Sequence, residues 1–179
     1  MNKYLSTLAL LFTLFISAAF GETLTHIKSF KANFTQEIQG EIGAKSIFYK
    51  GTLEATSTNL ALWNYTLPFK KQVYIEHGKA YIYEPMLNQV TIGSFDSQAD
   101  FLGVLKNAKK IDENTYEATI NKHVYTLKLK DSKPFTLSYT DDLGNNAIIT
   151  FSNVKLNEKL DKADFDFKIP EDAEIVHIN

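Results

Sequence analysis

The sequence predicts a mainly β protein of the α+β class. Most of the chain divides into short runs rich in Val, Ile, Thr, Tyr and Phe, and Gly, Asn, Asp or Pro separates these runs at spacings typical of antiparallel sheets. Several runs alternate apolar with polar residues, as expected for strands that have one dry face. Because no internal repeat or Gly/Ser-rich linker interrupts the pattern, we expect a single domain.

Strands are predicted wherever such runs are bounded by turn residues. These are Lys31–Gln39, Lys45–Thr56, Leu60–Thr66, Gln72–His77, Ala80–Glu84, Gln89–Ile92, Thr115–Asn121, Val124–Lys130, Phe135–Thr140, Ala147–Val154 and a short segment near Phe167. The strand from Leu60 is apolar on both faces. We expect its Trp63 face to point inward, because that face carries the larger apolar area.

Two helices are expected. A short one covers the region from Glu22 to Ser29, and a longer one runs from Asp96 to Lys110. Ser94 or Asp96 can cap the longer helix, and lysines near its C-terminal end complement the helix dipole. Its apolar stripe has to cover another surface, and comprises Phe101, Leu102 and Leu105.

The first 21 residues have the features of a cleaved secretory signal peptide. Lys3 provides the positive charge, Leu5–Ile16 is a short apolar run, and Ala19 and Gly21 are small residues at the cleavage positions. A membrane anchor is the alternative, but the run is shorter than the ~20 residues a spanning helix needs. We therefore expect residues 22–179 to form the mature single domain.

Composition excludes several kinds of chemistry. The chain has no Cys, which rules out disulfides, thiolate metal sites and a lipid-modified cysteine. The net charge of −2 and the absence of Arg argue against a nucleic-acid partner. The four His are isolated, and no nucleophile elbow or phosphate-binding Gly loop is present. We expect no catalytic residues, no metal and no cofactor, and interpret Asp141–Asn146 as a hairpin turn rather than a calcium loop.

Three stretches together resemble the periplasmic lipoprotein carrier family LolA. They are SFKANFTQEI with YKGTLEA (residues 29–38 and 49–55), NLALWNYTLPFKKQVYIEHGKAYIYEPMLNQVT (residues 59–91) and FDFKIPEDAEIV (residues 165–176). They occur in the family's order and span nearly all of the chain after the leader. The resemblance implies an open, incomplete antiparallel β-barrel, a half-barrel whose concave apolar face is covered by helices.

Aromatic residues make up 13% of the chain, and composition alone would assign them to an ordinary core. The resemblance instead implies an apolar cavity for acyl chains and a lid helix that carries the Phe101, Leu102 and Leu105 stripe. Many relatives place an Arg shortly before the Trp strand to latch the lid, and the matching position here is Ser57. The expected cavity residues are Phe34, Ile47, Tyr49, Leu53, Ala61, Trp63 and Tyr65.

The function implied by the resemblance is that of a periplasmic chaperone. It would carry acylated lipoproteins from an ATP-driven inner-membrane transporter to an outer-membrane acceptor lipoprotein, and it would act as a monomer. The alternative is a periplasmic lipid- or protein-binding scaffold or sensor with the same open-barrel fold, because fold alone does not determine function.

Overall fold

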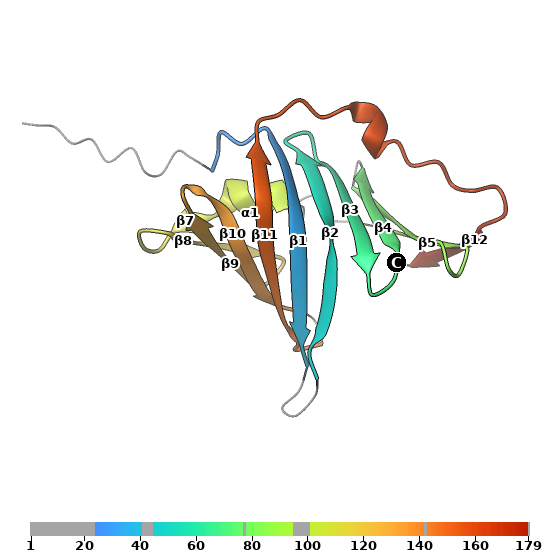
Figure 1. Cartoon of the computed structure of the whole chain (residues 1–179), viewed down its shortest axis with the longest axis horizontal. Coiled ribbons are helices and arrows are strands. Elements are labelled where there is room, and N and C mark those ends of the chain that lie inside the picture. Colours follow the sequence, from blue (N-terminus) through green and yellow to red (C-terminus); the bar gives the residue numbers. More distant parts are fainter. Residues whose placement is uncertain (1–23, 41–44, 77, 95–100, 142, 179) are drawn as a thin grey trace, which may run out of the picture.

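The computed structural model describes residues 24–40, 45–76, 78–94, 101–141 and 143–178, which form one curved, open sheet and a short helix. The sheet order is β12-β6-β5-β4-β3-β2-β1-β11-β10-β9-β8-β7, and all neighbours are antiparallel except β12 and β6 (Figure 1). The strands are β1 (Ser29–Gln39), β2 (Ile47–Thr56), β3 (Leu60–Leu67), β4 (Lys71–Glu76), β5 (Lys79–Glu84), β6 (Gln89–Ser94), β7 (Lys109–Lys110), β8 (Thr115–Ile120), β9 (His123–Lys130), β10 (Lys133–Thr140), β11 (Asn146–Leu156) and β12 (Glu174–Ile178).

The centre of the sheet is β1, which pairs with β2 on one side and β11 on the other. Its alternate residues Phe30, Ala32 and Phe34 are all buried on the concave face. The opposite face is charged, and Lys31 forms a 2.8 Å ion pair with Glu54 of β2 there. The strict period-2 pattern of β1 therefore determines which face of the whole sheet is dry.

Helix α1 (Phe101–Asn107) covers the upper part of the concave face (Figure 1). Its first five residues are buried, and all of them except Gly103 belong to the same apolar core as Phe30 and Phe34. A helix of seven residues is too short to be stable by itself in water, so its stability depends on this packing.

The C-terminal segment between β11 and β12 runs past the upper ends of the central strands to the far edge of the sheet (Figure 1). A 3₁₀ helix, η2 (Lys162–Phe165), begins at Asp161, whose side chain accepts a hydrogen bond from the Ala163 amide. Phe165 is buried, and the Phe167 ring stacks on Tyr74 with ring centroids 4.7 Å apart. This convex strap, residues 157–173, leads into β12 on the far edge of the sheet.

Most predicted strands are present with boundaries shifted by one or two residues, and the mainly β fold with an open sheet is confirmed. Asp141–Asn146 is a hairpin turn as predicted, because the Asp141 carboxylate accepts hydrogen bonds from the amides of Leu143 and Asn145. Asp112 and Asp141 both have a lowered pKa, caused chiefly by hydrogen bonds to each carboxylate.

Three predicted elements need correction. Residues 24–26 form a turn rather than part of a helix, and the predicted lid helix ends at Asn107 because Lys109–Lys110 pair with β8. The strand predicted near Phe167 is absent, and the strand in this region is instead β12. Its parallel pairing to β6 could not be inferred from the local pattern. The leader 1–21, residues 22–23 and Asp96 lie outside the described residues.

Gly51 allows a close approach of β2 to β3 at a register shift. A Cβ atom at this position would collide with the backbone carbonyl oxygen of Asn64, which cannot move without disturbing the strand pair. We expect Gly51→Ala to lower the free energy of unfolding by about 3 kcal/mol, as overpacking does. Urea denaturation measures this effect.

Gly144→Ala is the matched control, because a Cβ atom there meets open space although φ is +83°. Its expected cost is about 1 kcal/mol, the penalty for a left-handed alanine. Equal destabilisation by both substitutions would contradict the steric role of Gly51.

Candidate functional site

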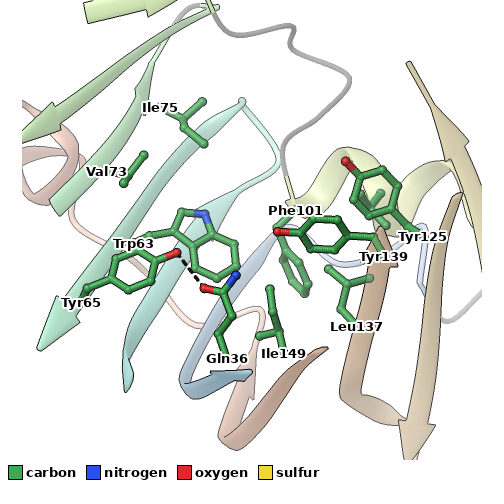
Figure 2. A pocket seen from close by; sticks show the side chains of 11 residues that line it. Gln36, Trp63, Tyr65, Val73, Ile75, Phe101, Tyr125, Leu137, Tyr139 and Ile149 are labelled. Atoms are coloured by element: carbon green, nitrogen blue, oxygen red, sulfur yellow. Dashed lines mark hydrogen bonds between the residues drawn. The ribbon is translucent and has the colours of Figure 1, made fainter. Parts of the chain in front are cut away.

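A cavity of about 260 Å³ lies between α1 and the concave face of the sheet. Residues from both halves of the sheet and from the helix converge on it (Figure 2). Its lining consists of Gln36, Trp63, Tyr65, Val73, Ile75, Phe101, Val104, Tyr125, Leu137, Tyr139 and Ile149. Nearly all of these side chains are aliphatic or aromatic, so the cavity suits an apolar ligand.

Phe101 anchors α1 to the sheet. Its ring lies 4.4 Å from that of Phe30 and 5.1 Å from that of Phe151, in tilted and edge-on geometries that aromatic pairs prefer. Phe101 also contacts Trp63 across the cavity, with centroids 6.5 Å apart. The same side chain therefore holds the helix in place and forms part of the cavity wall.

The polar groups of Gln36, Tyr65 and Tyr139 interrupt this apolar lining. The Tyr65 hydroxyl donates a 3.2 Å hydrogen bond to Oε1 of Gln36, whose side chain is only 6% exposed. Tyr139 extends from the opposite wall, with its hydroxyl pointing across the cavity (Figure 2). Burial raises the pKa of both phenols, and Tyr139 contributes further to the rise at Tyr65, so both remain protonated at neutral pH.

A charged contact ties the C-terminal end of α1 to the barrel. Lys106 Nζ donates a 3.0 Å hydrogen bond to the backbone carbonyl oxygen of Ser57, in the β2–β3 turn. The Ser57 amide in turn donates to the carbonyl of Lys28, just before β1. Lys106 is exposed, and water and salt weaken this bond accordingly.

A cavity of this kind, under a short helix on an open sheet, agrees with the comparison to known proteins. The model of the family "Outer membrane lipoprotein carrier protein LolA" matches residues 25–168. The chain belongs to the LolA family. An outer-membrane lipoprotein carrier protein of Helicobacter pylori (strain HPAG1) is 41% identical over 86% of this chain and 82% of its own length.

One further relative and one solved structure are also similar to this chain. The outer-membrane lipoprotein carrier protein of Wolinella succinogenes is 38% identical over 79% of this chain and 82% of its own length. A crystal structure of a LolA superfamily protein from Nitrosomonas europaea shares the fold, with a TM-score of 0.50 and 11% identity, over 83% of this chain and 96% of its own. The LolA family is one of carriers, not of enzymes.

The seven predicted cavity residues have different positions in this LolA-family structure. Trp63 and Tyr65 line the cavity, so the predicted inward face of β3 is correct. Phe34 lies directly behind them, 5.2 Å from Trp63 and 5.1 Å from Tyr65 between ring centroids. Leu53 and Ala61 are buried in the core outside the cavity lining.

The other two predicted residues lie toward the lower end of the sheet. Tyr49 contacts Tyr65 edge-on at 5.9 Å, and Lys71 Nζ lies 4.6 Å from the Tyr65 ring centroid and 5.8 Å from that of Tyr49. Ile47, near the start of β2, is 50% exposed. These two residues do not line the cavity.

The predicted lid stripe divides into two parts. Phe101 faces the cavity, whereas Leu102 and Leu105 are buried in the core without lining it. Val104 is the second residue of α1 that lines the cavity. Sequence reasoning missed Val104 together with Gln36, Val73, Ile75, Tyr125, Leu137, Tyr139 and Ile149. Strand alternation provided a signal for Gln36, which is two residues after Phe34 and shares its face.

Within the described residues, no group of three or more His, Asp or Glu side chains is arranged to hold a metal ion. Over the same residues, no helix has both the length and the apolar character needed to cross a membrane.

The raised pKa of Tyr65 predicts a loss of stability at alkaline pH. Burial favours the neutral phenol, so its stabilisation is complete below the ordinary pKa of 10.0 and declines as pH rises toward the higher pKa of the folded state. Urea denaturation between about pH 9 and pH 12 should show the free energy of unfolding falling by up to about 1.4 kcal/mol per pH unit for this group.

Tyr65→Phe removes the group that titrates and should therefore make the decline less steep. An identical pH dependence for the wild type and Tyr65→Phe would contradict the assignment of a raised pKa to Tyr65.

Proposed function

We propose that this chain is a periplasmic carrier that holds the acyl chains of lipoproteins in the cavity under α1 and moves them from the inner to the outer membrane. The observation that carries the proposal is an apolar cavity bounded by a short helix on an open sheet, in a chain of the LolA family. Residues 1–21 would act as the secretory leader, and residues 22–179 as a single, monomeric carrier domain.

The energetics of the cargo require such a cavity. Each buried methylene is worth roughly 0.8 kcal/mol, so an acyl chain of about fifteen methylenes contributes on the order of 12 kcal/mol toward remaining in a bilayer. A carrier must offer a comparably dry surface. The aromatic and aliphatic walls from Trp63, Val73 and Leu137 are of this kind.

The cavity has to enlarge before it can hold such a ligand. Its volume of about 260 Å³ is below the roughly 300–1,000 Å³ typical of sites that enclose drug-sized molecules, which are smaller than a diacylated lipid. Displacement of α1 is the simplest route, because the helix is short and forms one wall. The helix would then close over the empty site and move aside when acyl chains enter.

In this chain the charged donor of the lid latch lies on the helix. Ser57 is the position where relatives were expected to place an Arg, but here the Ser57 backbone carbonyl accepts a hydrogen bond from Lys106 of α1. The charged donor thus lies on the helix and the acceptor on the sheet, which is the reverse of the arrangement expected in relatives with an Arg at this position. We propose that Lys106 contributes to the closed state in place of the missing Arg.

The other proposed partners supply the energy that moves the cargo and receive the cargo after transport. The sequence contains no phosphate-binding Gly loop, so extraction of cargo from the membrane would be driven by an ATP-dependent inner-membrane transporter. Delivery would be to an outer-membrane acceptor lipoprotein. The alternative is a non-shuttling scaffold or sensor that binds a lipid or protein without transferring it.

The carrier function predicts transporter-dependent release. Purified chain 22–179 should release a radiolabelled lipoprotein from inner-membrane vesicles when the transporter and ATP are present, because the chain itself has no energy source. A second incubation with outer-membrane vesicles should transfer the label to them. Centrifugation followed by scintillation counting measures both steps.

Vesicles without ATP are the control and should retain the label. Binding of lipoprotein without transfer to the outer-membrane vesicles would favour the scaffold or sensor. Release by the chain alone would contradict the shuttle mechanism.

Replacing Lys106 should shift the lid equilibrium toward the open state. Lys106→Gln weakens the bond to Ser57 O, so lipid affinity should rise about two- to fivefold, as expected for an exposed charged contact. Trp63 is the only Trp and lines the cavity, so its quenching by a lipopeptide with brominated acyl chains reports binding.

Lys109→Gln is the matched control, since Lys109 lies beyond the helix in β7 and should leave the affinity unchanged. Equal affinities of the wild type and Lys106→Gln would show that this contact does not bias the lid.

A further inference from the structure

The cavity contains two hydrogen-bonding groups without a protein partner among the described residues. The Gln36 side chain uses Oε1 to accept from Tyr65, which leaves its Nε2 amide group free on the cavity side (Figure 2). The Tyr139 hydroxyl makes no hydrogen bond to any residue in the described part of the chain, although its ring packs on Tyr125 with centroids 5.2 Å apart. Two donors therefore face an apolar space.

Filling this space with hydrocarbon alone would be costly. A buried donor that loses its hydrogen bonds to water and gains no other partner is penalised by about 1–3 kcal/mol. A ligand that brings an acceptor into the cavity avoids this penalty. Pockets with apolar walls and a few convergent polar groups commonly use those groups to orient the ligand.

Gln36 is well placed to fix the position of an acceptor. Its side chain is 6% exposed, at the centre of β1, and the Tyr65 hydroxyl holds the orientation of its amide. Tyr139 approaches from β10 on the other wall of the cavity (Figure 2). The two groups come from opposite sides of a single space, so one oxygen atom between them could accept from both.

We propose that Gln36 Nε2 and the Tyr139 hydroxyl bind an acyl carbonyl oxygen of the cargo. Each acyl chain has one such oxygen at its head, either in an ester or in an amide. The contact would fix how far each chain enters the cavity, with the methylenes extending beneath Phe101 and Val104. This inference rests on the proposed carrier function and adds a subsite that selects acyl groups from other hydrocarbon.

The test compares ligands that differ only in the carbonyl. A peptide with S-[2,3-bis(palmitoyloxy)propyl]cysteine at its N-terminus has two ester carbonyls, and its dihexadecyl ether analogue has the same chains without them. Each displaces a brominated-chain lipopeptide that quenches Trp63, which gives relative affinities by competition.

The wild type should bind the diester about tenfold more tightly than the diether, as expected for one or two hydrogen bonds in a dry site. Tyr139→Phe keeps the ring that packs on Tyr125 and should reduce this ratio several-fold. The Gln36→Met/Tyr65→Phe pair removes the amide without stranding the Tyr65 hydroxyl, and should reduce the ratio as well.

Tyr49→Phe is the matched control, because Tyr49 lies on the same face of the sheet but does not line the cavity. Its diester-to-diether ratio should equal that of the wild type. Equal binding of diester and diether by the wild type would overturn the carbonyl site and leave the carrier function intact. Failure of every ligand to displace the quencher would overturn both.

Discussion

The structure depends on one constraint, which is that the sheet is dry on its concave face but does not close on itself. A closed barrel would bury that face by strand pairing alone, whereas here β12 and the short β7 are separate edges. The apolar face therefore has to be covered by something other than a strand. Phe101, packed on Phe30 and Phe151, holds the covering helix in place. The cavity is the space that this small cover leaves unfilled.

The two faces of the sheet are stabilised in different ways. On the convex face, the strap of residues 157–173 places Phe167 against Tyr74, Tyr81 and Tyr83, and it ends in the paired strand β12. On the concave face, the cover is the seven-residue helix α1. The exposed Lys106 bonds its C-terminal end to the carbonyl oxygen of Ser57. The strap and the helix are thus attached to the sheet by different kinds of contact.

Local sequence patterns predicted most strands and the inward face of β3, because side-chain alternation is a property of each strand by itself. They did not predict most of the cavity lining. Tyr139 and Ile149 reach the cavity only because β11 pairs with β1, more than a hundred residues earlier in the chain. The strand β12 was missed for the same reason, since its parallel partner β6 is remote and its five residues lie mostly exposed.

Sequence reasoning found the helix and its apolar stripe but could not say which of the stripe's residues face the cavity. Phe101, Leu102 and Leu105 are all apolar, and spacing alone cannot distinguish a side chain that packs on the core from one that faces an empty space. Which of these side chains faces the cavity depends on the curvature of the sheet beneath the helix. That curvature arises from twist accumulated over many strand pairs, which no single segment encodes.

In the proposed mechanism, the balance between holding and releasing a lipid would follow from the contacts that α1 exchanges when it moves. On opening, Phe101 and Val104 would exchange contacts with the sheet for contacts with an acyl chain, which offers them the same kind of apolar surface. Opening would therefore replace apolar contacts with the sheet by apolar contacts with the ligand. The hydrophobic contributions to the free energies of the closed and open states would then nearly cancel. The equilibrium between the closed and open states would then be determined by hydrogen bonds. These are the Lys106–Ser57 bond in the closed state and the carbonyl contacts proposed for the filled state. Free-energy differences as small as those of a few hydrogen bonds would allow a carrier to bind tightly enough for transport and still release its cargo.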